Sequence, residues 1–182
     1  FIIVYFSILF LSVFFEAGCV FSIVLEDCLF IISSMIECAR ACGLGIEVIL
    51  HPILSCGGKQ TAVSYLVLDA VPDEIPETFE ASLKGVLEDV KLAAGSFEAM
   101  KLLTQRASSC LTAEQQSGKR KDDIALEMAA FLEWLERGYF LFLGAAVWNI
   151  EGGNRTGSKP MESHGLFQSR SEFSSILLSE SA

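Results

Sequence analysis

An acidic pair is the first feature of this sequence whose residue types and spacing could do chemistry. Glu26 and Asp27 end an apolar run and precede a stretch with helical spacing. Two carboxylates at such a junction can hold a cation or an amine, or they can cap the helix and interact with its positive end. Both interpretations stay open, and Asp27 is the residue that we expect at the N-cap.

The cysteines and histidines do not assemble into a recognisable site in the sequence. Cys38 and Cys42 are one helical turn apart, which suits a metal ion, but His51 and His164 are isolated and supply no nearby ligand. The spacings of the six cysteines are irregular for a disulfide framework. We therefore expect no metal site, and we interpret the cysteines as buried, reduced thiols that act as small hydrophobic residues in a cytosolic protein.

Catalytic and cofactor motifs are missing from the sequence. It contains no G-x-G-x-x-G and no G-x-S-x-G. The segment Gly57-Gly58-Lys59-Gln60-Thr61 has some likeness to a phosphate loop, but it lacks the leading glycine and the Ser/Thr after the lysine. A hairpin turn explains it better. We expect no catalytic residues and no cofactor-binding residues in the chain.

Charge and composition exclude further classes of function. Hydrophobic residues make up 52% of the chain, enough for a core, and 13 Lys+Arg against 23 Asp+Glu give a net charge of −10. Binding a phosphate backbone needs clustered cations, so we expect no nucleic-acid partner. The first residue is Phe1 rather than Met, and we expect the chain to be a piece of a longer protein.

The hydrophobic start has two interpretations. Residues 1–15 are almost entirely apolar, and after Glu16 the apolar run continues to residue 25. Phe, Ile, Val and Tyr dominate, which favours a pair of strands that turn at or near Ala17-Gly18. The alternative is a membrane anchor within residues 1–25, which approaches the length of a membrane span only if Glu16 is tolerated.

Regular signals follow from residue 20. Residues 20–25 and 46–54 are predicted strands, and Pro52 should lie at an edge or a bulge of the second one. Between them, residues 28–41 have helical spacing, with Gly43 as the residue that ends the helix. Its predicted inward side chains are Leu29, Ile32, Met35, Ile36 and Ala39. A third strand is predicted over residues 61–69.

The second half is predicted to be mainly helical. Pro76 could open a helix that runs to about residue 107 and that Gly95-Ser96 can divide in two. A second helix is predicted over residues 124–137, with Gly138 as its end. Its predicted inward side chains are Leu126, Met128, Ala129, Phe131, Leu132 and Leu135. A buried strand should start at Tyr139, and the rest should form loops, with one short element near residues 173–178.

The order strand–helix–strand–strand–helix predicts an α+β fold with a ferredoxin-like unit, followed by a helix and a further strand segment. We divide the chain into a hydrophobic segment over residues 1–19, a ferredoxin-like domain over residues 20–110 and a helix–strand extension over residues 111–182.

Several stretches resemble one family. Residues 25–54 contain a predicted strand that ends in acidic residues and then a predicted helix. Gly43-Leu44 and a strand that contains His51-Pro52 follow. Residues 82–100 and 129–150 continue the likeness in order. The most specific motif residues are Phe131, Trp134, Leu135, Phe140, Phe142 and Gly144. These stretches resemble the N-terminal, ACT-like region of the large NAD-specific glutamate dehydrogenases.

The resemblance implies that residues 20–110 form an ACT-like domain with a regulatory or assembly role. ACT-like domains often bind amino acids at the turn after their first strand, so it implies a candidate effector-binding turn formed by Glu26, Asp27, Cys28, Ser33 and Ser34. Leu29 and Ser33 depart from the family, which has Pro and Asp there. The parent would be a cytoplasmic, homo-oligomeric oxidoreductase that binds NAD elsewhere, and the partner of this chain would be the remainder of that enzyme. The alternative is a small membrane-anchored interaction protein.

Overall fold

The structure, a computed structural model, describes residues 8–15, 18–70, 72–117, 123–152, 154–157 and 160–168. It has an α+β fold with antiparallel sheets. The chain divides into two compact units, Phe1–Lys91 and Leu92–Ala182, and the division falls within helix α2 (Phe79–Gly95). The boundary predicted after residue 110 instead falls inside helix α3 (Phe97–Gln116).

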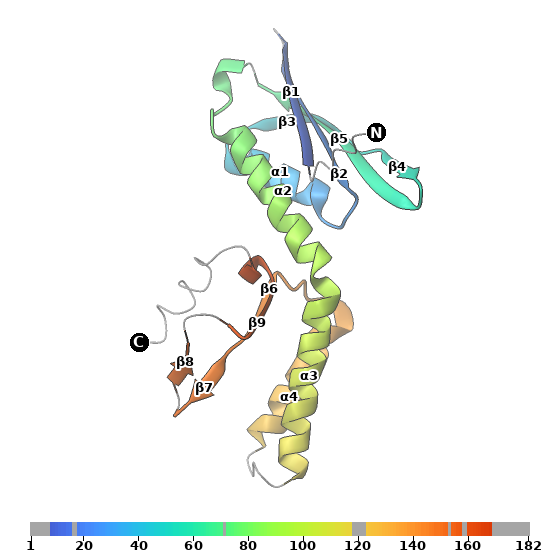
Figure 1. Ribbon diagram of the computed structural model, residues 1–182. Helices are drawn as coiled ribbons and strands as arrows, with labels where there is room; N and C mark the ends of the chain where they lie inside the picture. The colour runs from blue at the N-terminus through green and yellow to red at the C-terminus, as the bar shows by residue number, and fades with distance from the viewer. Residues whose placement is uncertain are drawn as a thin grey trace. The chain divides into compact units, whose positions relative to one another are not determined.

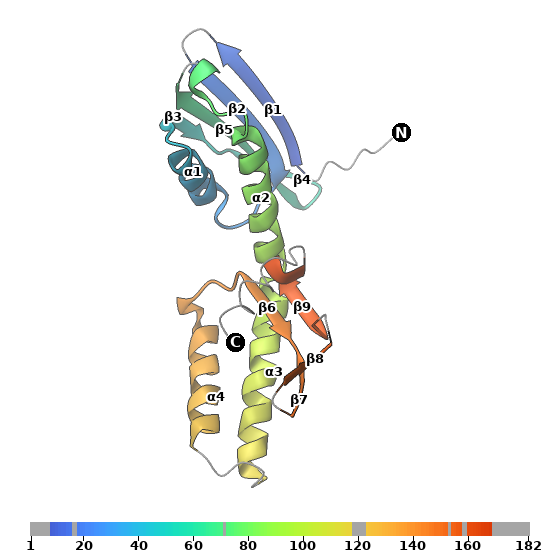
Figure 2. The same cartoon turned by 90° about the vertical axis from the view of Figure 1, so that its left-hand side faces the viewer.

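The first unit is a five-stranded antiparallel sheet with helices on one face (Figure 1, Figure 2). Its strands are β1 (Ile8–Phe15), β2 (Gly18–Glu26), β3 (Gly45–Leu50), β4 (Ile53–Cys56) and β5 (Lys59–Asp69). The strand order is β1-β2-β5-β3, and β4 also pairs with β5. The helices are α1 (Ile31–Ala41) and α2, and a short 3-10 turn, η1 (Pro72–Glu74), precedes α2.

Strand β1 answers part of the question raised by the hydrophobic start. It pairs with β2 from Ile8 opposite Leu25 to Phe15 opposite Gly18, so the strand interpretation is confirmed for residues 8–15 and 18–26. In a ferredoxin-like β-α-β-β-α-β unit, the strand after the second helix lies at this edge. Here the N-terminal strand takes that place. Residues 1–7, 16 and 17 lie outside the described residues.

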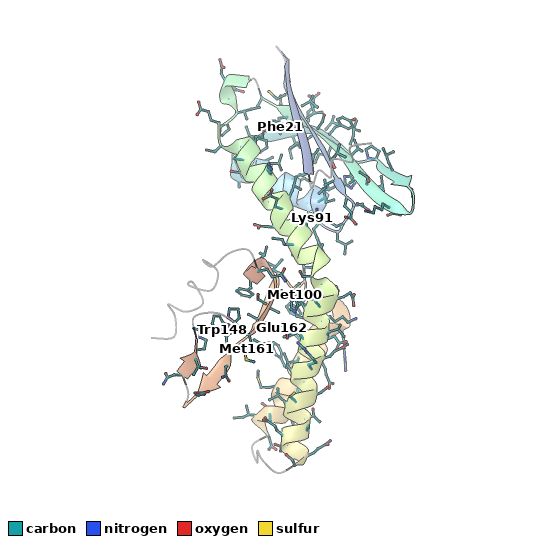
Figure 3. All side chains as sticks on the ribbon, in the orientation of Figure 1. Phe21, Lys91, Met100, Trp148, Met161 and Glu162 are labelled. Carbon is teal, nitrogen blue, oxygen red and sulfur yellow. The ribbon has the colours of Figure 1, made fainter. Side chains whose placement is uncertain are left out.

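The core of the first unit lies between the sheet and its helices. Alternate residues of β2 and β5 point inward, and α2 covers them with Phe79, Leu83 and Leu87, all fully buried. The ring of Phe21 on β2, which Figure 3 labels, meets that of Phe79 edge-on, with centroids 5.1 Å apart. Each fully buried side chain of this size contributes about 1.5–3 kcal/mol relative to exposure.

Helix α1 ends as predicted but starts differently. Gly43 has φ 73°, and Leu44 N donates to the Ala39 carbonyl at 2.9 Å, which closes the helix with a left-handed residue. The N-cap is Phe30 rather than Asp27, because the chain makes a further turn after β2 and Asp27 N donates to Gln60 O at 3.0 Å.

The inward face of α1 is also rotated from the prediction. Its buried residues are Ile31, Met35, Cys38 and Ala39, whereas Leu29 is 72% exposed and Ile32 is also exposed. The prediction began the helix at residue 28 and so counted Leu29 in its inward face, whereas α1 begins only at Ile31. Within α1 the exposed polar residues Ser33, Glu37 and Arg40 lie on the opposite side from Met35 and Cys38.

The second unit contains α3, α4 (Ile124–Trp134) and two small sheets. A π turn, η2 (Leu135–Tyr139), follows α4. Strand β6 (Gly144–Val147) pairs with β9 (Glu162–Gly165), β7 (Asn149–Glu151) pairs with β8 (Asn154–Thr156), and η3 (Leu166–Gln168) follows β9. Helix α3 packs against α4 and also contacts β6 and β9 (Figure 2).

Two predictions for the second half are confirmed in outline. The helical region from Pro76 is divided at Ser96 into α2 and α3, and Gly138, with φ 90°, ends the helical segment that includes α4. Within the residues that the structure describes, none of the helices combines the length and the apolar composition needed to cross a membrane.

Other predictions for this half are wrong. No strand starts at Tyr139, because that residue still belongs to the π turn, and β6 begins only at Gly144. The predicted loop region contains β8 and β9. Of the predicted inward residues of α4, Leu126, Met128 and Phe131 are exposed. The element predicted at residues 173–178 lies outside the described part of the chain.

Candidate functional site

The candidate site is a cavity at the turn between β2 and α1. Its volume is about 460 Å³, and it is lined by Asp27, Cys28, Leu29, Phe30, Ile31, Ile32, Ser33, His51 and Ile53. Three of the predicted turn residues therefore lie in it: Asp27, Cys28 and Ser33. The other two, Glu26 and Ser34, do not line it.

The backbone of this turn is held in an unusual conformation. Phe30 has φ 73°, the left-handed region that costs a residue with a Cβ atom about 1–2 kcal/mol. The Phe30 carbonyl accepts the first hydrogen bond of α1, from Ser34 N at 3.0 Å. Strain of this kind persists only where the surrounding structure fixes it, and it often marks binding sites.

His51 reaches the cavity because the edge of the sheet is interrupted. Strands β3 and β4 both pair with β5, and His51-Pro52 lies between them. Pro52 cannot donate to the ladder, but its carbonyl accepts from Val63 N at 2.9 Å. The prediction that Pro52 lies at an irregular edge position is confirmed. His51 was predicted only as a family-motif residue, and the structure adds it to the candidate site.

A row of three polar side chains crosses the wall of the cavity. His51 Nδ1 is hydrogen-bonded to Ser64 Oγ at 2.7 Å, and His51 Nε2 lies 3.8 Å from Asp27 Oδ1. Nε2 is the nitrogen that faces Asp27, and it carries the ring proton in the tautomer in which the Ser64 hydroxyl donates to Nδ1. The imidazole is thus oriented from behind by Ser64, and its free edge faces the cavity beside the carboxylate.

This row does not form a working nucleophile. Ser64 is fully buried, so its hydroxyl cannot reach a substrate in the cavity. Burial, followed by the neighbouring carboxylates of Asp27 and Glu26, raises the pKa of the Cys28 thiol. A thiol is a nucleophile only as its thiolate, so Cys28 is held in its unreactive form.

The cavity has two poles of opposite sign. The N–H groups of residues 31–33 precede the first hydrogen bond within α1, and no acidic residue occupies the first turn of that helix. A helix N-terminus of this kind favours an anion. Asp27 places a carboxylate on the same cavity, which favours a cation. The arrangement can hold a small molecule that carries both charges.

Sequence reasoning missed Ser64 and Ile53. One signal for Ser64 was present, because it occupies an inward position of β5 among Ala62, Leu66 and Leu68. A polar residue at a core position needs a hydrogen-bond partner. The partner itself, His51, could not be identified without the pairing of β5 with β3 and β4.

The remaining motif residues lie in the second unit and form packing contacts. The Trp134 ring lies between those of Phe131 and Phe140, with centroid distances of 5.9 and 4.8 Å, and Leu135 follows it in the π turn. Phe142 packs on Phe97 at 6.1 Å. A Cβ atom on Gly144 would lie 2.6 Å from the Phe167 ring, so this position admits only glycine without a shift. These residues have structural roles.

A second cavity, of about 590 Å³, lies between α3 and β9. Arg106 Nη2 donates to Glu162 Oε2 at 2.5 Å, and His164 Nε2 is 2.8 Å from Glu162 Oε1 (Figure 3 labels Glu162). Hydrogen bonds from His164, and then from Arg106, lower the pKa of the Glu162 carboxyl. This cluster ties β9 to α3. Among the described residues, no three His, Cys, Asp or Glu side chains are grouped so that they could hold a metal ion.

No protein-family model matches the chain, and a search of curated proteins finds no match.

Proposed function

We propose that the chain is a regulatory and assembly segment of a large, cytoplasmic NAD-dependent glutamate dehydrogenase and that it performs no catalysis itself. The parent enzyme would convert glutamate into 2-oxoglutarate and ammonia while it reduces NAD, and NAD would bind in the remainder of that enzyme. The partners of the segment would be that remainder and other copies of the same subunit.

Two kinds of evidence support this proposal. The first is the ordered series of motifs in residues 25–54, 82–100 and 129–150. The second is the α+β, ferredoxin-like unit, whose turn after β2 has the position of the effector turn in ACT-like domains. The pairing of Ile8–Phe15 with β2 favours the proposal over a small membrane-anchored interaction protein, because these residues are used in the sheet.

One observation carries the regulatory part of the proposal: the cavity has Asp27 at one pole and the N-terminus of α1 at the other. A free amino acid has an ammonium group and a carboxylate in the same small molecule. The ammonium group would bind Asp27, and the carboxylate would accept hydrogen bonds from the first N–H groups of α1.

Calorimetric titration of the chain with each L-amino acid tests the effector. We expect binding of at least one of them, weakened about tenfold or more by Asp27→Ala, because a hydrogen bond to a charged group is worth about 1.5–3 kcal/mol. Glu26→Ala is the matched control, since Glu26 is the adjacent carboxylate, is exposed and does not line the cavity. Equal weakening by both substitutions, or no heat with any amino acid, would leave only an assembly role.

The parent enzyme is tested separately, by sequencing the full-length transcript. We expect a dehydrogenase domain downstream of residue 182 in the same reading frame. A stop codon soon after this residue, with no such domain, would refute the assignment to a glutamate dehydrogenase, whatever the calorimetry shows.

A further inference from the structure

The walls of the cavity between β2 and α1 are mostly apolar, and several of these side chains are exposed. Leu29 is 72% exposed, Ile53 49%, Phe30 45% and Ile32 39%. They come from three places in the fold: the turn after β2, the start of α1 and the first residue of β4. Small-molecule sites have mostly apolar walls and volumes of about 300–1,000 Å³. The cavity, at about 460 Å³, has both properties.

Strand β4 contributes one of its two exposed apolar side chains to the cavity. Ile53 is paired with the fully buried Ala62, and Leu54 is paired with Thr61. Successive residues of a strand lie on opposite faces of a sheet. Leu54 is 57% exposed, but only Ile53 lines the cavity. These two neighbours therefore form a matched pair for testing what the apolar wall does.

The only full charge on the walls is negative. Asp27 lines the cavity with its carboxylate, and no Lys or Arg side chain is among the described residues that line it. His51 Nε2 lies 3.8 Å from Asp27 Oδ1, so an acidic group that approached the imidazole would also meet this carboxylate. The walls therefore favour an ammonium group and disfavour a second carboxylate beside it.

A cation on α2 reaches the turn electrostatically, but it lies outside the walls. Burial, followed by Asp27 and Glu26, raises the pKa of the Cys28 thiol, and Lys91 opposes them with the smallest of these effects (Figure 3 labels Lys91). The two carboxylates thus outweigh Lys91 at the turn.

Two further cations lie on neighbouring elements. Lys59 begins β5 and is adjacent to Gln60, whose carbonyl accepts from Asp27 N at 3.0 Å. Arg40 is in the last turn of α1 and pairs with Glu37 at 2.9 Å. Neither cation lines the cavity. A ligand side chain that lies against the walls meets apolar groups, and an acidic one would lose water there without gaining a cation.

We propose that the effector is an amino acid with an apolar side chain, such as leucine, and that the cavity discriminates against acidic amino acids, among them glutamate, the substrate of the proposed parent enzyme. This inference rests on the proposed effector role of the cavity. The apolar side chain of the ligand would pack on Phe30, Ile32 and Ile53, while its ammonium group binds Asp27. Regulation would then respond to an amino acid other than the one that the parent enzyme consumes.

Calorimetric titration of the full chain with four L-amino acids tests the selectivity. The side chains of leucine, asparagine and aspartate have the same arrangement of non-hydrogen atoms but differ in polarity and charge, and glutamate is the proposed parent substrate. We expect leucine to bind about tenfold or more tightly than asparagine, because burial of a leucine side chain contributes about tenfold or more in affinity. Aspartate and glutamate should bind more weakly still.

Replacement of Ile53 tests the apolar wall separately from the charged pole. Ile53→Ser should weaken leucine binding about fivefold or more and reduce the preference for leucine over asparagine. Leu54→Ser is the matched control, because it makes a similar change at the adjacent exposed position outside the cavity, and it should alter neither. Both variants should keep the wild-type circular dichroism spectrum, since both side chains are exposed.

The outcomes separate this inference from the proposed effector role. Equal binding of leucine and asparagine, or equal effects of Ile53→Ser and Leu54→Ser, would overturn the inference alone. Tighter binding of aspartate or glutamate that Lys59→Ala or Lys91→Ala weakens would also overturn it and would assign the cavity to an acidic effector. No heat with any amino acid would remove the effector role itself and the inference with it.

Discussion

Removing the hydroxyl of Ser64 tests whether His51 is held in the candidate site by a hydrogen bond. Ser64 is fully buried, and its Oγ lies 2.7 Å from His51 Nδ1. A net hydrogen bond contributes about 0.5–1.5 kcal/mol to stability, and a buried polar atom that is left without its partner costs about 1–3 kcal/mol. The side chain of His51 is partly exposed, so water can reach the ring. We expect Ser64→Ala to destabilise the first unit by about 1–1.5 kcal/mol.

A double-mutant cycle separates this bond from simple packing. If Ser64 and His51 interact directly, Ser64→Ala should cost much less in a His51→Ala background, with a coupling free energy of about 1 kcal/mol. The pair Asp27 and His51 is the comparison. Its 3.8 Å separation is too long for a hydrogen bond, so the coupling in an Asp27→Asn and His51→Ala cycle should stay below about 0.5 kcal/mol.

Urea unfolding followed by two probes measures these effects. Far-UV circular dichroism includes the sheet of the first unit, whereas both tryptophans, Trp134 and Trp148, belong to the second unit. The substitutions should shift the dichroism transition and leave the tryptophan fluorescence transition in place. Additive effects of Ser64→Ala and His51→Ala, or a coupling as large for Asp27 as for Ser64, would refute the arrangement described for the cavity wall.

Two further predictions concern the turn and the cluster on β9. Phe30→Gly should be more stable than Phe30→Ala by about 1 kcal/mol in urea unfolding, the reverse of their order within a helix, because only glycine adopts φ 73° without strain. The same order as in a helix interior would contradict the left-handed conformation. For Glu162, a lowered pKa in the folded state means that its stabilising effect is present above the ordinary carboxyl range and is lost as the pH falls through the folded pKa. The stability advantage of the wild type over Glu162→Gln, followed by tryptophan fluorescence, should therefore shrink towards acid pH, and a constant difference would contradict the ion cluster.

Local signals predicted the first unit well where single residues determine the backbone. Gly43 ends α1 with φ 73°, and Gly57 and Gly58 turn the hairpin between β4 and β5 with φ 60° and 81°. Each conformation is one that glycine adopts without cost. Pro52 likewise marked the interruption at the edge of the sheet, because it cannot donate to a strand partner. In these places the sequence restricts the backbone directly.

The rotation of the helices about their axes and the tertiary contacts of the aromatic residues could not be predicted in the same way. Helix α4 is apolar on most sides, so several rotations bury a similar number of hydrophobic residues. In the structure its small residues Ala125 and Ala129 are the buried ones. For α1 the start of the helix was misplaced, because the sequence does not show that Phe30 adopts φ 73°. The apolar run from Tyr139 predicted a buried strand, but Phe140 and Phe142 pack on Trp134 and Phe97 instead. These outcomes depend on tertiary contacts.

Only part of the candidate site could be predicted, for the same reason. Asp27 was found because a carboxylate at a strand–helix junction has a small number of uses. The partnership of His51 with Ser64 needed the pairing of β5 with both β3 and β4, which joins residues that are thirteen positions apart. A single sequence gives the residue types on each strand, but it gives the register between strands only weakly.

Under the proposed function, Asp27 both binds the ammonium group of the effector and lowers the reactivity of the neighbouring Cys28. Its carboxylate makes one pole of the cavity attractive to an ammonium group. The same charge, after burial, contributes to the raised pKa of the Cys28 thiol and so disfavours its reactive thiolate. Ser64, the other nucleophile type in the row, is fully buried behind His51. Asp27→Ala should therefore weaken binding of an amino acid while it makes Cys28 more reactive towards iodoacetamide.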